Sequence, residues 1–239
     1  MSFCIKANFI DEFKIGDNVN FNLQILKILY DQYERLGKEK SLLIKPILIL
    51  NTSIAEAVLY DFIQNRIKNA NRTEIILPFL TAIFKLKKFD RFEHYIEQAR
   101  THDLFSTKNT EFYEAMDILR KKRNRIHIQN DKREDPKNEQ DVFDEKSKIL
   151  SEIVVEKIFN TMVAKYPRRK EYHDYVADFE IPWERHFKLK PKEVIKKPFY
   201  RGDPMIWSET KKKWFVISKY GEWLEFADTE STIEWRTIE

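Results

Sequence analysis

Cysteine and glycine are scarce in this chain of 239 residues, and both shortages restrict the folds that it can adopt. The single cysteine, Cys4, cannot form an internal disulfide bond and cannot supply the pair of thiolates that structural zinc sites commonly use. Four glycines and eight prolines are too few for a loop-rich or repeat-built β protein. We therefore expect an ordinary hydrophobic core, with no metal ion and no other cofactor.

Long apolar runs are also lacking. The longest, LLIKPILIL at 42–50, is interrupted by Lys45 and Pro46 and falls well short of the roughly 20 apolar residues that cross a bilayer. The stretch MSFCIKANFIDEFKIG does not combine a basic start with an apolar run, as a secretory signal peptide does. These observations predict a cytoplasmic protein that has no membrane contact.

Charge is nearly balanced over the whole chain, with 43 basic and 39 acidic residues and a net charge of +4. Such a small excess does not indicate a nucleic-acid partner by itself, and only a local cluster of charge could do so. One cluster stands out. The segment RKKRNRIHIQN, residues 120–130, places five Lys or Arg residues and one His within its first eight positions.

Apolar residues recur with helical spacing through the first two thirds of the chain, and no strand pattern interrupts them. Helices are expected over 21–37, 42–67, 76–89, 90–105, 106–129 and 142–166. Helices in direct succession are typical of an antiparallel helical bundle. We therefore predict a mainly α fold in which the bundle spans residues 1–167.

The composition changes after residue 167. Residues 168–197 are polar and basic and contain two prolines, which predicts a linker. In 198–239 the runs KWFVIS and EWLEFAD are separated by KYG, a hairpin pattern with glycine at the turn. A small, Trp-rich β-meander is therefore expected as a C-terminal appendage.

A helical wheel divides the basic cluster into two groups, because each residue of an α-helix turns by about 100°. Arg123 falls inside the apolar stripe, and Arg120, Asn124 and His127 fall beside it. Three further residues fall on the opposite side, which is expected to face solvent, namely Lys121, Lys122 and Arg125. The apolar stripe itself consists of Phe112, Met116, Leu119 and Ile126.

The position of Arg123 calls for a counter-charge, since burying an unpaired guanidinium costs several kcal/mol. A structural ion pair with Glu56 or Asp61 of an earlier helix would satisfy it. A cleft at a subunit interface or a bound anion would satisfy it equally well. The geometry of the helix leaves these alternatives open.

The string LRKKRNRIHIQ, residues 119–129, resembles the signature of the HEPN superfamily. That signature is an Arg, a spacer of four to six residues and a His, often with a polar residue after the Arg. Arg120 and His127 enclose six residues, and Arg123 with Asn124 looks like the Arg-polar pair, although only three residues separate Arg123 from His127. The order of the helices extends the resemblance to about residues 20–166.

The resemblance implies metal-independent cleavage of RNA at a site that two copies of the motif share in a homodimer, in a toxin or phage-defence protein. His127 would move a proton at the ribose 2′-OH or at the leaving 5′-oxygen. Arg123 and Arg120 would hold the phosphate, and Asn124 would orient the His or the phosphate. Expected partners are RNA, a second copy of the chain and, in a toxin, an antitoxin or other protein.

Two other functions fit the same residues. The chain could be a HEPN-like module without catalysis that binds RNA, a nucleotide or a protein partner. It could also be a structural helical protein in which the Arg and His residues form ion pairs only. Cleavage of RNA in the presence of a chelator distinguishes the ribonuclease from these two alternatives. Binding of RNA distinguishes the module without catalysis from the structural protein.

A composite site requires two copies of the chain, so we predict a two-fold dimer that brings the two motif helices together. Light scattering at micromolar concentration should give the mass of a dimer. A monomer under those conditions would count against a shared site.

Overall fold

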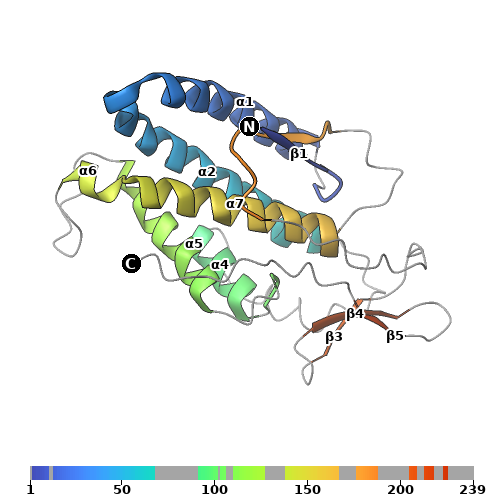
Figure 1. Ribbon diagram of the computed structural model, residues 1–239. Coiled ribbons are helices and arrows are strands. Elements are labelled where there is room, and N and C mark those ends of the chain that lie inside the picture. Colours follow the sequence, from blue (N-terminus) through green and yellow to red (C-terminus); the bar gives the residue numbers. More distant parts are fainter. Residues whose placement is uncertain are drawn as a thin grey trace.

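The structure is a computed structural model of the chain (Figure 1), and its description covers a defined set of residues. These are 2–10, 13–67, 91–101, 103–105, 110–126, 138–166 and 176–187, with the strand segments 205–208, 213–217 and 223–225. Helices dominate this part of the chain, as the sequence predicts. They are α1 (Phe13–Arg35), α2 (Ile44–Tyr60), α4 (Phe92–Thr101), α5 (Thr110–Arg123), α6 (Glu139–Val142) and α7 (Glu145–Lys165). The helix expected over 76–89 lies outside the described residues.

The helices α1 and α2 are consecutive and pack against each other, joined by the 3-10 turn η1 (Gly37–Leu43) (Figure 1). α1 begins at Phe13 rather than at residue 21, because buried Val19 continues the apolar pattern toward the N-terminus. Gly37 follows the helix with a φ of 49°. That left-handed conformation favours glycine, which has no Cβ to clash, and it ends α1 close to the expected position.

The core lies between α2 and α7, which pack against each other along much of their length (Figure 1). α2 carries two adjacent apolar rows, and Ile54, Val58 and Leu59 are all at most 2% exposed. α7 buries side chains around most of its circumference, among them the consecutive residues Val154 and Val155. Helices buried on more than one face are core helices. The others cover them, so the fold is built around this pair.

The segment Gly37–Gln64 has the length and the apolar composition of a membrane-crossing helix. No run of that kind is expected from the sequence, because Lys45 and Pro46 interrupt its most apolar part. The segment continues beyond α2 through the π-helical η2 (Asp61–Ile67), which lengthens it. Half of its most apolar stretch is buried by the rest of the protein, and a core helix meets the same criteria of length and composition.

α4 and α5 form a second pair of helices beside α2 (Figure 1). On α4 the buried residues are Phe92, Tyr95, Ile96 and Ala99, which recur at the spacing of a single helix face. The first three are the apolar residues that predict this helix in the sequence. α7 begins after Asp144, whose side chain accepts a hydrogen bond of 2.9 Å from the Ser147 backbone N–H. This cap sets the start of α7.

Residues 168–197 are expected to be a polar linker, but their described part, 176–187, packs against the helices. β2 (Phe179–Ile181) pairs antiparallel with β1 (Phe3–Ile5), with Phe3 opposite Ile181. Phe179 and Ile181 are fully buried, and the Phe179 ring lies 5.3 Å from that of Phe159 in α7. A three-residue strand is too short to give a visible alternation among polar neighbours, so the sequence does not indicate it.

The C-terminal residues contain the expected meander. β3 (Met205–Ser208), β4 (Lys213–Ile217) and β5 (Trp223–Glu225) form an antiparallel sheet in chain order. Ile217 lies opposite Trp223, so the hairpin encloses the KYG sequence. The predicted hairpin is confirmed by this pairing.

Gly16 of α1 lies directly beneath Val176, which leads into β2. A Cβ added at Gly16 would lie 2.5 Å from Cγ2 and 2.8 Å from Cγ1 of Val176. Val is stiff at χ1, so its side chain cannot simply turn away. We predict that Gly16→Ala destabilises the fold by about 1–3 kcal/mol, although alanine is the better helix former.

Chemical denaturation of Gly16→Ala and of Gly16→Ala/Val176→Ala tests this prediction. The second substitution removes both methyl groups that the new Cβ meets, so the double variant should regain part of the lost stability. A Gly16→Ala protein as stable as the parent would show that the segment after α7 does not lie on α1.

Candidate functional site

The end of α5 carries the basic cluster. The predicted buried stripe is confirmed over most of its length, since Phe112, Met116 and Leu119 are at most 2% exposed. α5 ends at Arg123, and η3 (Asn124–Ile126) continues as a 3-10 turn. A wheel drawn for a continuous α-helix therefore fails beyond Arg123. Ile126, placed in the stripe by the wheel, is 51% exposed, whereas Arg125, placed in solvent, is 5% exposed.

Arg123 forms an ion pair with Glu56 of α2. Its Nη2 lies 2.6 Å from Glu56 Oε2, and about a quarter of each side chain is exposed. Burial raises the pKa of Glu56, and the charge and hydrogen bond of Arg123 offset only part of that rise. The sequence leaves three alternatives for Arg123: an ion pair, a cleft at a subunit interface and a bound anion. The structure shows the ion pair, with Glu56 as the partner. The pair joins α5 to α2.

Arg120 is held by two carboxylates. Its Nη2 and Nε lie 2.7 and 2.8 Å from Asp117 Oδ1, and its Nη1 lies 3.5 Å from Glu93 Oε2 of α4. Lys121 also binds Asp117, at 3.0 Å. Burial opposes ionisation of Asp117, but the hydrogen bonds from Lys121 and Arg120 outweigh it and lower the pKa of this carboxyl group. The guanidinium of Arg120 is therefore held by carboxylates of α4 and α5.

Lys122 does not face solvent as the wheel predicts. Its Nζ donates a hydrogen bond of 2.6 Å to the Val142 carbonyl and a second one to Ser147 Oγ. The wheel gives only the direction of a side chain, and here the corner between α6 and α7 covers that direction. Asn124 is exposed, and His127 lies outside the described residues. The predicted site residues that the structure describes, Arg120, Arg123 and Asn124, therefore lie in the last turn of α5 and at the start of η3.

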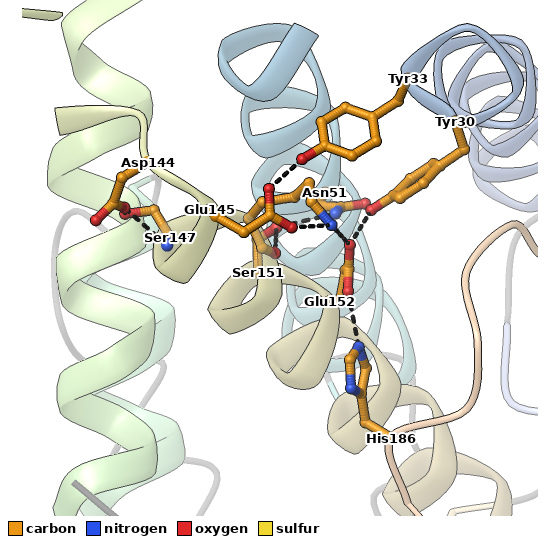
Figure 2. A network of polar contacts seen from close by, with 10 residues as sticks. Tyr30, Tyr33, Asn51, Asp144, Glu145, Ser147, Ser151, Glu152 and His186 are labelled. Carbon is orange, nitrogen blue, oxygen red and sulfur yellow. Dashed lines mark hydrogen bonds and ion pairs between the residues drawn. The ribbon is translucent and has the colours of Figure 1, made fainter. Parts of the chain in front are cut away.

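A second polar cluster, not found from the sequence, surrounds Glu152 of α7 (Figure 2). Glu152 Oε1 accepts hydrogen bonds from Tyr30 Oη at 2.6 Å and from Lys148 Nζ at 2.8 Å. Glu152 Oε2 lies 2.7 Å from His186 Nε2. The Glu152 side chain is only 4% exposed. We call Tyr30, Lys148, Glu152 and His186 the Glu152 network.

Further contacts extend the network toward the surface and along α7. Lys148 Nζ also lies 3.0 Å from Glu145 Oε1, and Tyr33 Oη donates a hydrogen bond to Glu145 (Figure 2). One turn beyond Glu152, the buried carboxylate of Glu156 accepts hydrogen bonds of 2.9 Å from the backbone N–H groups of His186 and Phe187. Two glutamates of α7 therefore hold the segment that follows β2.

The pKa shifts show which state the network stabilises. Burial alone would raise the pKa of Glu152, but the hydrogen bonds and charges of His186, Lys148 and Tyr30 lower it overall. Burial and the charge of Glu152 raise the pKa of Tyr30 well above its usual value. Tyr30 is therefore a hydrogen-bond donor and Glu152 a fixed anion. Both oxygens of Glu152 are occupied, so it cannot act as a general base without losing a donor.

The sequence offers little sign of this network, because Glu152 and His186 are 34 residues apart. The structure gives His186 a partner, Glu152, that no motif in the sequence indicates. The one local signal is a pair of glutamates, Glu152 and Glu156, one turn apart in an otherwise apolar part of the last helix. Within the described residues, no cluster of His, Cys, Asp and Glu could hold a metal ion.

Comparisons of the chain with protein-family models, curated proteins and solved structures gave no match. Functional assignment therefore depends on the two clusters. Both oxygens of Glu152 are already occupied by donors of the chain, whereas Arg120 and Arg123 are partly exposed side chains of the type that binds phosphate. The end of α5 is the better candidate for a binding or catalytic site.

The Glu152 network predicts a specific loss of stability in acid. The folded-state pKa of Glu152 lies below its unfolded value of about 4.5. Its contribution is therefore complete above that pH and is lost as the pH falls through the lower, folded-state value. Glu152→Gln should destabilise the fold by about 3–5 kcal/mol at pH 7, because buried donors lose their anion.

Denaturation curves between pH 3 and pH 7 provide the measurement. The matched control is Glu180→Gln, since Glu180 pairs with Lys27 at 2.7 Å on the surface, where both side chains are more than 40% exposed. The control should lose far less stability. Equal losses in the two variants would mean that the Glu152 network does not hold the fold together.

Proposed function

We propose that the end of α5 binds an RNA phosphate and that the protein is a metal-independent endoribonuclease of the HEPN type. The observation that carries this proposal is the pair Arg120 and Arg123, which lie one turn apart, are partly exposed and are held in place by carboxylates. Arginine binds phosphate through two parallel hydrogen bonds, and a guanidinium that is already positioned loses less entropy when it does so.

A phosphate can replace a carboxylate at Arg123, because both are anionic acceptors of similar geometry. The exchange leaves Glu56 without its counter-charge. Arg123 is the partner that lowers the pKa of Glu56 against burial, so the pKa rises further when Arg123 turns toward the phosphate. Glu56 then takes up a proton more readily, which avoids a buried unpaired anion. In this way Glu56 would keep Arg123 in place until RNA arrives.

The proton transfer at the reacting atoms is assigned to His127, the residue after η3 (Asn124–Ile126). An imidazole with an ordinary pKa near 6.5 can remove the proton of the ribose 2′-OH or protonate the leaving 5′-oxygen at neutral pH. Arg123 and Arg120 would stabilise the charge on the phosphate, and exposed Asn124 would orient the His or the phosphate.

The proposal includes a homodimer, in which two copies of the motif complete one site. Two apolar side chains near the motif support it, since Ile118 is 46% exposed and Ile126 is 51% exposed. In such a dimer the partner copy would cover both side chains and remove their apolar surface from water. A role as a toxin or in phage defence, in the cytoplasm and controlled by an antitoxin or other protein, belongs to the same proposal.

A second candidate function follows from the 2.6 Å distance between Arg123 and Glu56. In that case the pair is a structural connection between α5 and α2, and the chain binds RNA, a nucleotide or a protein partner without cleaving it. The two candidate functions predict different effects on RNA cleavage and on stability when His127, Arg123 or Glu56 is substituted.

We expect the purified protein to cleave RNA in EDTA, and His127→Ala to lower the rate by about 10²–10⁴-fold while the melting temperature stays near that of the parent. Lys38→Ala is the control, because Lys38 is an exposed lysine in η1, outside the basic cluster and its ion pairs. It should cleave at the parental rate. Parental activity in a folded His127→Ala protein would refute the catalytic role.

A double-mutant cycle on Glu56→Gln and Arg123→Ala separates the second candidate. A purely structural pair predicts that both single variants lose stability, that the double variant loses little more, and that no cleavage exists to be affected. The ribonuclease predicts that Arg123→Ala reduces cleavage more than its effect on stability explains, whereas Glu56→Gln leaves Arg123 free to bind phosphate and retains activity.

A further inference from the structure

Tyr60, the last residue of α2, is a large aromatic side chain that remains 41% exposed. It lies four residues beyond Glu56, so the two side chains are neighbours on one face of α2. Glu56 is the partner of Arg123. An exposed aromatic ring therefore lies one helical turn from Glu56, on the same face of α2 as this partner of Arg123.

The ring of Tyr60 is held in place from one side. Its centroid lies 6.0 Å from that of Tyr95 in α4, with the two planes at 72° in an edge-to-face arrangement. Tyr95 is buried, at 2% exposure, so it provides a rigid support. Edge-to-face pairs are among the favoured aromatic geometries. Tyr60 therefore presents its ring to solvent in a defined orientation.

Three helices meet at this place. α2 contributes Glu56 and Tyr60, α4 contributes Tyr95, and α5 contributes Arg120 and Arg123. A fixed aromatic surface beside a pair of arginines is the combination that binds unpaired nucleotides, with the base on the ring and the phosphate on the guanidinium.

We propose that Tyr60 is a stacking surface for an unpaired base next to the phosphate bound by Arg123. This inference rests on the proposed function and assigns a further residue to its RNA-binding site. A base inside a duplex is covered by its neighbours and cannot stack on a protein ring. Stacking accepts any base, because each has a π-face, so the site discriminates by strandedness rather than by sequence.

Binding is tested with 2′-O-methyl RNA, which keeps bases and phosphates but has no 2′-OH to attack. Fluorescence polarisation should show that Tyr60→Ala weakens binding of the single-stranded oligomer by about 5- to 150-fold, the range for one stacked base. Tyr60→Phe should bind like the parent, because it keeps the ring. An oligomer without bases should bind the parent and Tyr60→Ala equally.

Two further variants make the result specific. Phe21→Ala removes another exposed aromatic ring, 62% exposed and on α1, and should leave binding unchanged. Tyr60→Leu keeps apolar contact with Tyr95, so it replaces Tyr60→Ala if the alanine variant does not fold. A duplex of the same sequence should bind the parent more weakly than the single strand and should be insensitive to Tyr60.

The outcomes separate the two proposals. If the parent cleaves RNA and Tyr60→Ala binds and cleaves equally well, the stacking role is wrong and the ribonuclease stands. If the parent binds single strands through Tyr60 but does not cleave RNA in EDTA, the stacking role stands and the ribonuclease is wrong. A parent protein that binds no RNA overturns both.

Discussion

The buried negative charge of Glu152 is the constraint on which much of the described structure depends. A carboxylate in the centre of a helical protein is tolerated only when donors replace the water that it loses. Its donors come from three parts of the chain, namely Tyr30 of α1, Lys148 one turn earlier in α7, and His186 after β2. The charge is satisfied only when all three are in place, so the network couples α1 and the 176–187 segment to α7.

The two polar clusters use carboxylates in opposite ways. At Glu152 the donors outweigh burial and lower the pKa, so the anion is permanent and its partners are fixed. At Glu56 burial outweighs a single Arg123, and the pKa is raised. The ionised pair is therefore held more weakly than the Glu152 network. The first arrangement suits a scaffold, and the second suits a site that exchanges one anion for another.

The sequence predicts the structural features that depend on residues close together in the chain. Helical spacing indicates α4 and the buried stripe of α5, and the partner of Arg123 is among the alternatives because a buried guanidinium needs a carboxylate. Contacts between distant segments are not visible in that way. The β1–β2 pairing joins three-residue strands far apart in the chain, and the burial of Arg125 and the bonds of Lys122 depend on a change of helix type and on the α6–α7 corner.

The pairing of Phe3 with Ile181 has a consequence for biosynthesis. Ribosomes add about 5–20 residues per second, so β1 leaves the ribosome on the order of 10 s or more before its partner strand exists. During that time β2 is not available to cover the side chains that the folded protein buries in this segment, including Ile5, Ala7 and Phe9. The nascent chain therefore carries an unpaired apolar strand until residues 179–181 have been made, and this strand is accessible to a chaperone during that time.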